Sequence, residues 1–131
     1  MKTNILVMED DSFTQQFYGL LFQRAGFDSL ITDEGDKFFE ILETTQVSII
    51  ILDLNLKNTY LNNEKVDGIT LAKKVKGDNR FSQIPILIVS AYKNLTNGRN
   101  FLVETGAEDY ILKPISDFNE LLKKVNHLKL F

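Results

Sequence analysis

The chain has 131 residues, 44% of them hydrophobic and 25% charged, with a formal net charge of −3 and no cysteine. This length provides one complete hydrophobic core and is too short for two ordinary domains, so we expect one globular domain over residues 1–131, with no apolar run long enough to span a membrane. The net negative charge argues against direct binding of nucleic acid. The lack of cysteine excludes disulfides and thiolate metal sites. The absence of a signal-peptide pattern in residues 1–4 predicts a cytoplasmic protein.

The start of the chain predicts a strand followed by an amphipathic helix. Residues 4–8 form an apolar run that the following acidic residues end. The helix is expected over residues 12–25, with Ser12 and Gln15 as a capping box and Gly26 as its stop. Asp11 is expected to be only a turn or cap residue. The apolar residues at helical spacing, which we expect to face the core, are Phe13, Phe17, Leu20 and Leu21.

The run VSIIILDLNL, residues 47–56, predicts the central strand of a parallel sheet. A long run of β-branched residues and leucine is typical of a strand that is covered on both faces. Asp53 interrupts the run, so the carboxyl end of this strand carries an acid to the sheet edge where open α/β sheets bind ligands. Asp53 is therefore the first candidate functional residue.

The rest of the chain continues the alternation of strands and helices. Residues 57–65 are polar, lack periodicity and predict a loop. A helix is expected over residues 97–105, with Phe101 and Leu102 buried, but its asparagines and glycine have poor helix propensity and we expect the segment to be mobile. The other expected strands lie at 27–31, 84–89 and 109–112, and the other expected helices at 36–44, at 69–76 and around Phe118, Leu121, Leu122 and Val125.

Five strands that alternate with five helices predict a doubly wound parallel sheet. Each crossover between parallel strands is right-handed and places its helix on one face of the sheet. The expected fold class is therefore α/β, with three layers in the order α/β/α.

Polar side chains follow four of the predicted strands. Glu9 and Asp10 follow the first strand, Asp53 the third, Ser90 the fourth and Lys113 the fifth. Because the carboxyl ends of parallel strands share one edge, we expect these groups to converge. Clustered carboxylates repel one another unless a cation lies among them, and hard oxygen ligands suit Mg²⁺. A carboxylate beside Mg²⁺, with a hydroxyl and a lysine opposite, forms a site that can accept a phosphoryl group.

The order of short motifs along the whole chain resembles the receiver domain of two-component response regulators. The motifs are ILVMEDD, IILDLNL, VDG, ILIVSA and GAEDYILKP. The resemblance implies a flavodoxin-like five-stranded sheet with the strand order 2-1-3-4-5. It also implies a signalling switch of the chemotaxis-regulator type, and no enzyme activity beyond the protein's own phosphorylation and dephosphorylation.

The resemblance implies a role for each residue at the strand ends. Asp53 would be the phosphoacceptor. Asp10 and Asp53 would hold Mg²⁺ directly, Glu9 would act mainly through water, and the backbone carbonyl of Asn55 would be the remaining protein ligand. The side chains that would contact the phosphoryl group are Ser90 and Lys113.

The resemblance also implies partners and a switching mechanism. A histidine kinase or histidine phosphotransfer protein would phosphorylate Asp53, and movement of Ser90 would then allow Tyr110 to rotate inward. The altered surface of the fourth helix, fifth strand and fifth helix would bind a downstream effector protein or form a phosphorylation-dependent homodimer. The Lys113–Pro114 bond is expected to be cis. The positions expected to tune dephosphorylation are Asn55, Ala91 and Tyr92.

Two segments depart from the family pattern. The spacing between Asp53 and Gly68 is several residues longer than in the usual motif, and Lys57 stands where a proline is common. The extra segment KNTYLNNEKV, residues 57–66, would lie beside the phosphorylation site as a lid or as a neutral surface insertion. A smaller insertion between Ser90 and Gly106 leaves the register of the fourth helix open.

Two other functional classes stay open. A receiver-like interaction module would keep the fold without being phosphorylated, although the set of Asp10, Asp53, Ser90 and Lys113 argues against it. Phosphatases of the haloacid-dehalogenase type also use an aspartyl phosphate and Mg²⁺. Their motif has a second acid two residues after the nucleophile, where this chain has Asn55.

Overall fold

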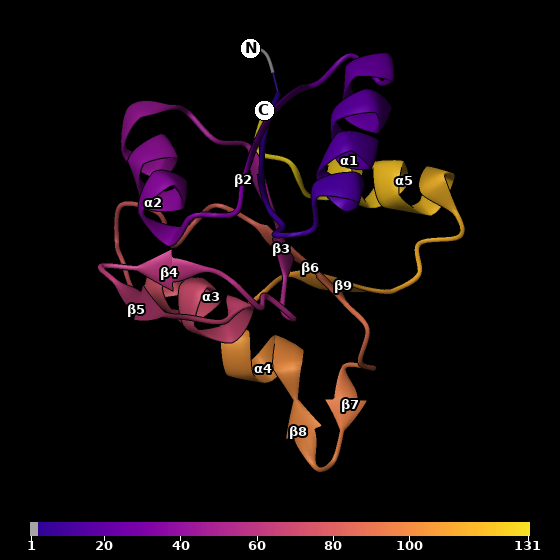
Figure 1. The fold of residues 1–131 in the computed structure, drawn as a ribbon. Helices are drawn as coiled ribbons and strands as arrows, with labels where there is room; N and C mark the ends of the chain where they lie inside the picture. Colours follow the sequence, from indigo (N-terminus) through magenta and orange to yellow (C-terminus); the bar gives the residue numbers. More distant parts are fainter. Residues whose placement is uncertain (1–2) are drawn as a thin grey trace.

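Five parallel strands form the central sheet of the computed structural model, which describes residues 3–131 (Figure 1). The strands are β1 (Asn4–Met8), β2 (Asp28–Thr32), β3 (Ile49–Asp53), β6 (Ile86–Ser90) and β9 (Asp109–Leu112). They lie in the order β2-β1-β3-β6-β9, which is the predicted 2-1-3-4-5 order and confirms the α/β fold class. Within residues 3–131, no helix is long and apolar enough to cross a membrane. Met1 and Lys2, which belong to the segment without a signal-peptide pattern, lie outside the described residues.

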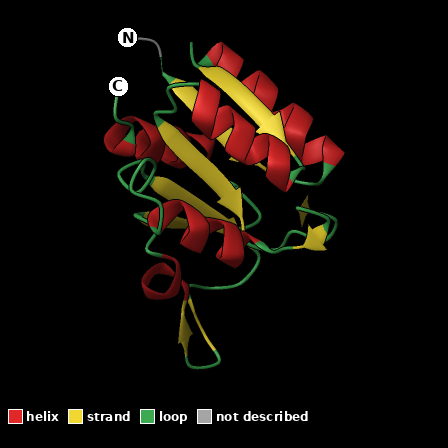
Figure 2. Cartoon of the chain, turned by 90° about the vertical axis from the view of Figure 1, so that its left-hand side faces the viewer, coloured by secondary structure: helices red, strands yellow, loops and turns green. Residues whose placement is uncertain are grey.

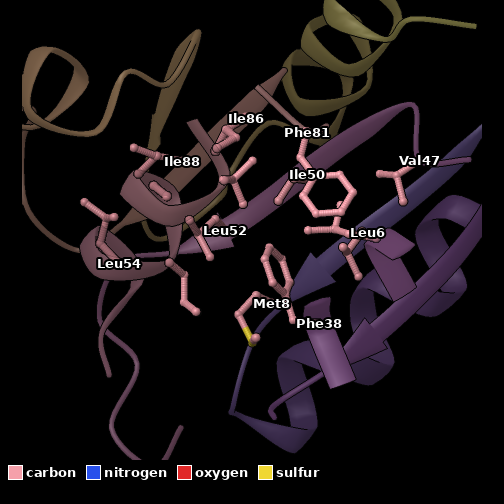
Figure 3. Packing of buried hydrophobic residues seen from close by; sticks show 14 of the residues in the cluster. Leu6, Met8, Phe38, Val47, Ile50, Leu52, Leu54, Phe81, Ile86 and Ile88 are labelled. Carbon is pink, nitrogen blue, oxygen red and sulfur yellow. The ribbon is translucent and has the colours of Figure 1, made fainter. Parts of the chain in front are cut away.

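Helices cover both faces of this sheet (Figure 2). On one face, α1 (Ser12–Arg24) and α5 (Phe118–Leu128) pack against side chains such as Ile5, Val7 and Ile51. On the other face, α2 (Gly35–Thr44), α3 (Gly68–Lys76) and α4 (Phe101–Thr105) pack against the alternate strand residues. Figure 3 shows Leu6, Ile50 and Phe38 in this second layer. Both faces of the inner strands β1, β3 and β6 are therefore apolar, which explains the unbroken runs in their sequences.

The helix α1 begins at Ser12 and Asp11 precedes it as a cap, both as predicted, but the expected capping box and the expected buried side are different in the structure. Asp11 is the cap residue, because its Oδ2 accepts a hydrogen bond of 2.9 Å from Thr14 N. The proposed Ser12 and Gln15 capping box was wrong, since Gln15 Nε2 donates to the Glu9 carbonyl at 2.7 Å. The side chains of α1 that are fully buried are Tyr18 and Phe22, whereas Phe17 and Leu21 are half-buried and Phe13 and Leu20 are exposed. The predicted apolar face had left out Tyr18 and Phe22, the two residues of α1 that lie in the core.

The central strand is shorter than the apolar run that predicted it. The run spans residues 47–56, but β3 ends at Asp53. There Asp53 Oδ1 accepts a hydrogen bond of 2.9 Å from Asn55 N, which turns the chain away from the sheet. Leu54 and Leu56 remain buried beyond the strand, so their apolar character reflects packing and not strand structure.

Two small antiparallel hairpins replace irregular or helical structure that the sequence predicted. The first, β4 (Tyr60–Leu61) and β5 (Glu64–Lys65), lies within the predicted loop 57–65 and turns through Asn62 and Asn63, both with positive φ. The second, β7 (Leu95–Thr96) and β8 (Arg99–Asn100), turns through Asn97 and Gly98, again with positive φ, and projects from the domain (Figures 1 and 2).

The helix predicted over 97–105 was therefore wrong over its first half. Only Phe101–Thr105 is helical as α4, and Asn100 caps it by accepting from Val103 N. Phe101 is buried as predicted, and Leu102 is half-buried. Asn-Gly and Asn-Asn pairs favour the left-handed turns of tight hairpins, and this preference decides the structure of residues 97–100, where helix propensity is poor.

Candidate functional site

Three carboxylates meet at the carboxyl edge of the sheet. Glu9 and Asp10 directly follow β1, Asp53 ends β3, and one carboxylate oxygen from each lies within 4.8 Å of the other two. Glu9 and Asp53 are only 1% and 5% exposed, whereas Asp10 is half-buried. All three line a pocket of about 350 Å³ that also contains Asn55 and Lys113. The predicted convergence of the acids is thus present in the structure.

Lys113 lies between two of these acids. Its Nζ is 2.9 Å from Asp53 Oδ2 and 3.2 Å from Glu9 Oε1. Its backbone N donates to the Ser90 carbonyl at 2.7 Å, which fixes the loop after β9 beside the end of β6. The Lys113–Pro114 bond is cis, as expected.

Burial and charge shift the pKa values of this cluster. Burial, together with the negative charge of Asp53, raises the pKa of Glu9 above its ordinary value, although Lys113 partly opposes the shift. Burial by itself would lower the pKa of Lys113, but its bonds to Asp53 and Glu9 outweigh burial and raise it. Lys113 thus contacts two of the three carboxylates, and negative charge remains in excess within this cluster. This excess of hard, negatively charged oxygen ligands fits a divalent cation such as Mg²⁺.

Ser90 and Asn55 are joined beside Asp53. Ser90 is fully buried, and its Oγ donates to Asn55 Oδ1 at 3.1 Å. The Ala91 backbone N donates to the same oxygen at 3.1 Å. The Asn55 side chain therefore connects the segment after β3 to the end of β6.

Tyr110 continues this network toward the β7–β8 hairpin. Its hydroxyl donates to the Tyr92 carbonyl, and Tyr92 N in turn donates to Ser90 Oγ at 3.1 Å. Burial raises the pKa of Tyr110, and the Ser90 hydroxyl partly offsets the shift. The Tyr92 side chain is 56% exposed and does not line the pocket around Asp53, whereas Ala91 does.

Sequence reasoning missed two groups at the site. The backbone amides of Lys57 and Asn58 donate to Asp10 Oδ2, at 2.6 and 3.0 Å respectively. Since every residue except proline has an amide, the side-chain pattern contained no indication of these bonds; the only clue was a non-proline residue at position 57.

Sequence reasoning also left the glycine of the VDG motif without a physical role. A Cβ on Gly68 would lie 2.2 Å from the Asp53 carbonyl oxygen, so the start of α3 can pack this closely behind Asp53 only with glycine.

The model of the response regulator receiver domain family matches residues 5–126. The chain belongs to this family. Among curated proteins, it is 30% identical over 125 residues to the two-component response regulator ORR5 of Oryza sativa, covering 93% of this chain and 87% of that protein. It is also 30% identical over 124 residues to the DNA-binding dual master transcriptional regulator RpaA of Synechocystis, covering 95% of this chain and 48% of the regulator. It therefore spans about half the length of that relative.

Solved receiver structures have the same fold. A putative response regulator from Chloroflexus aurantiacus superposes with a TM-score of 0.82 at 23% identity, covering 98% of both chains. The receiver domain of the sensor histidine kinase PA1611 from Pseudomonas aeruginosa superposes with a TM-score of 0.80 at 20% identity, again over 98% of both chains, and that structure has a magnesium ion in its active-site cleft. This chain is thus a receiver domain of two-component signalling, a family that generally acts as a switch.

Proposed function

We propose that this receiver domain is a phosphorylation switch that accepts a phosphoryl group on Asp53 in a Mg²⁺-dependent reaction. The observation that carries the proposal is the position of Lys113, whose ammonium contacts Asp53 and Glu9 while Asp10 lies on the same pocket. A structural ion pair would need one acid; the second and third carboxylates indicate a site prepared for further positive charge.

Asp10 and Asp53 would hold the metal directly, with Glu9 acting mainly through water and the Asn55 carbonyl as the remaining protein ligand. When bound, Mg²⁺ would neutralise charge on the phosphoryl oxygens and on the attacking carboxylate. Glu9 supports this assignment, because its pKa is raised by burial and by Asp53, and its charged form therefore gains from a nearby cation.

The reaction would be an in-line transfer from a phosphohistidine. A carboxylate oxygen of Asp53 forms the new phosphorus–oxygen bond as the phosphorus–nitrogen bond to the donor imidazole breaks, and the imidazole takes up a proton. Lys113 Nζ, already 2.9 Å from Asp53 Oδ2, would pair with the transferred phosphoryl oxygens. The donor would be a histidine kinase or a histidine phosphotransfer protein.

Output would pass through Ser90 and Tyr110. Ser90 Oγ donates to Asn55 and accepts from Tyr92 N, so a phosphoryl group that draws the hydroxyl toward Asp53 would break both contacts. The Tyr92 carbonyl also accepts the Tyr110 hydroxyl, so the same movement would release Tyr110 and the β7–β8 hairpin. The change would be a population shift with a local electrostatic cause.

The surface that responds would bind a downstream effector protein or a second copy of the chain. It consists of the β7–β8 hairpin, α4, β9 and α5, and four apolar side chains on these elements are exposed. They are Leu95 at 70%, Val103 at 78%, Leu112 at 44% and Phe118 at 44%. Exposed side chains of this kind are suited to a partner whose binding depends on the switch.

Phosphorylation of an Asp53→Asn variant tests the proposal. With a labelled small-molecule phosphodonor and Mg²⁺, the wild-type protein should form an acyl phosphate that hydroxylamine removes, and the variant should not. The matched control is Asp117→Asn, at the cap of α5, because asparagine also caps helices and Asp117 does not line the pocket around Asp53. Label on the Asp53→Asn variant equal to that on the control would refute Asp53 as the acceptor. A wild-type protein that neither takes up label nor binds the phosphoryl mimic beryllofluoride in the presence of Mg²⁺ would instead favour an interaction module that is not phosphorylated.

A further inference from the structure

The inserted segment 57–66 contacts the proposed metal site through its backbone. We infer that the amides of Lys57 and Asn58 act as a clamp that holds the Asp10 carboxylate in its metal-binding orientation. Docking of the inserted segment and occupation of the metal site would then favour each other. This inference rests on the proposed function, because it assigns a positioning role toward the same metal site.

Both amides bind one oxygen of Asp10. The Lys57 and Asn58 nitrogens lie 2.6 and 3.0 Å from Oδ2. Within residues 3–131 the Asp10 side chain accepts no other hydrogen bond, so its Oδ1 is available to bind a ligand. Hydrogen bonds to an ionised acceptor are stronger than neutral ones, and two donors on one oxygen restrict rotation of the carboxylate. Asp10 is half-buried, and without the clamp it would rotate more freely beside the pocket.

The clamp is part of a segment that is fixed at a second point. Asn62 N lies 3.2 and 3.3 Å from the two carboxylate oxygens of Asp36, in the first turn of α2. The Tyr60 carbonyl lies so close to Gly35 that a Cβ there would be 2.6 Å from its oxygen. The β4–β5 hairpin therefore packs directly on the start of α2 (Figure 1).

Docking of the segment also carries a cost. Thr59, between the clamp and the hairpin, is fully buried, and its Oγ1 has no hydrogen-bond partner among residues 3–131. An unsatisfied buried hydroxyl is unfavourable, so the docked arrangement is opposed by part of its own packing. This cost brings the docked and undocked states of the segment closer in free energy. A ligand that adds a contact at Asp10 therefore shifts the equilibrium toward the docked state.

Reciprocity makes the coupling measurable from either side. Groups that orient a metal-binding carboxylate typically change metal affinity by about 10- to 100-fold when they are removed. If the clamp raises Mg²⁺ affinity by a given factor, Mg²⁺ must stabilise the docked clamp by the same factor.

Proline and alanine at position 57 separate the amide from the side chain. Lys57→Pro and Lys57→Ala both lose the ammonium, but only the proline variant loses the N–H that bonds to Asp10. We expect Lys57→Pro to bind Mg²⁺ about tenfold more weakly than Lys57→Ala in a calorimetric or NMR titration with the metal alone. Equal affinities within about twofold in two folded variants would refute the clamp, since second-shell effects are larger than that. The pair Asn58→Pro and Asn58→Ala repeats the comparison if proline at position 57 disrupts folding.

Amide hydrogen exchange tests the reciprocal effect without any substitution. In the wild-type protein, saturating Mg²⁺ should slow exchange of the Lys57 and Asn58 amides by about the same factor as the clamp adds to affinity. Exchange that is unchanged or faster would refute the inference. A wild-type protein that binds no Mg²⁺ at all would refute the proposed metal site itself, which distinguishes that failure from a failure of the clamp alone.

Discussion

The buried hydroxyl of Thr59 predicts that replacement with valine stabilises the protein. Valine has nearly the shape of threonine, and the hydroxyl that it replaces is fully buried without a hydrogen-bond partner in the part of the chain that the structure describes. Leaving such a group unsatisfied costs about 1–3 kcal/mol. We therefore expect Thr59→Val to raise the free energy of unfolding by about 1 kcal/mol. For a domain of this size that gain corresponds to an increase in Tm of about 4 °C.

Thr105→Val is the matched control for this prediction. Thr105 is also buried, but its hydroxyl donates to the Phe101 carbonyl at 2.6 Å and accepts from Ala107 N at 3.2 Å. The same substitution there removes two hydrogen bonds and should lower stability by about 1 kcal/mol or more. Urea unfolding followed by far-UV circular dichroism measures both variants. A Thr59→Val protein no more stable than wild type, beside a destabilised Thr105→Val protein, would show that the Thr59 hydroxyl is satisfied in solution.

Three further predictions concern the surroundings of Asp53. Gly68→Ala should destabilise the protein by about 1–3 kcal/mol or more, because its Cβ would meet backbone atoms at 2.2 and 2.7 Å. The control Gly19→Ala, whose Cβ would lie 3.8 Å from its nearest neighbour, should be neutral or stabilising. Urea unfolding measures both variants. The raised pKa of Glu9, caused by burial and by Asp53, contributes stability that is complete below its ordinary pKa of 4.5 and is lost as pH rises through the raised value. In EDTA, Glu9→Gln should therefore reduce the loss of stability between about pH 4.5 and neutrality relative to wild type, and parallel pH profiles would contradict this reasoning. Mg²⁺ at ten times its dissociation constant should stabilise the wild-type protein by about 1.4 kcal/mol and leave the stability of an Asp10→Ala variant nearly unchanged. An equal shift in Tm for both proteins would exclude Asp10 as a metal ligand.

The sequence predicted the sheet well because buried parallel strands leave a strong pattern. Unbroken apolar runs identified the inner strands β1, β3 and β6, whereas the edge strands β2 and β9 followed from shorter apolar groups in the alternation of strands and helices. Acids, a serine and a lysine at the strand ends identified the residues that meet at the edge of the sheet. The prediction failed where short-range backbone preferences competed with apolar spacing. Asn97 and Gly98 form a hairpin turn within a segment that had been predicted as a helix, and Gln15 donates to the Glu9 carbonyl instead of forming a capping box with Ser12.

The details that distinguish this receiver domain are mostly backbone features. The clamp on Asp10 is made by amides, and the close approach behind Asp53 depends on the missing side chain of Gly68. Neither the amides nor the close approach appears in a pattern of side chains, because each depends on where the fold brings a peptide group. A receiver with proline at position 57 has the same acids but cannot form the first of these bonds. We therefore expect the inserted segment to affect Mg²⁺ binding through the backbone amides that it places beside Asp10, more than through its side chains.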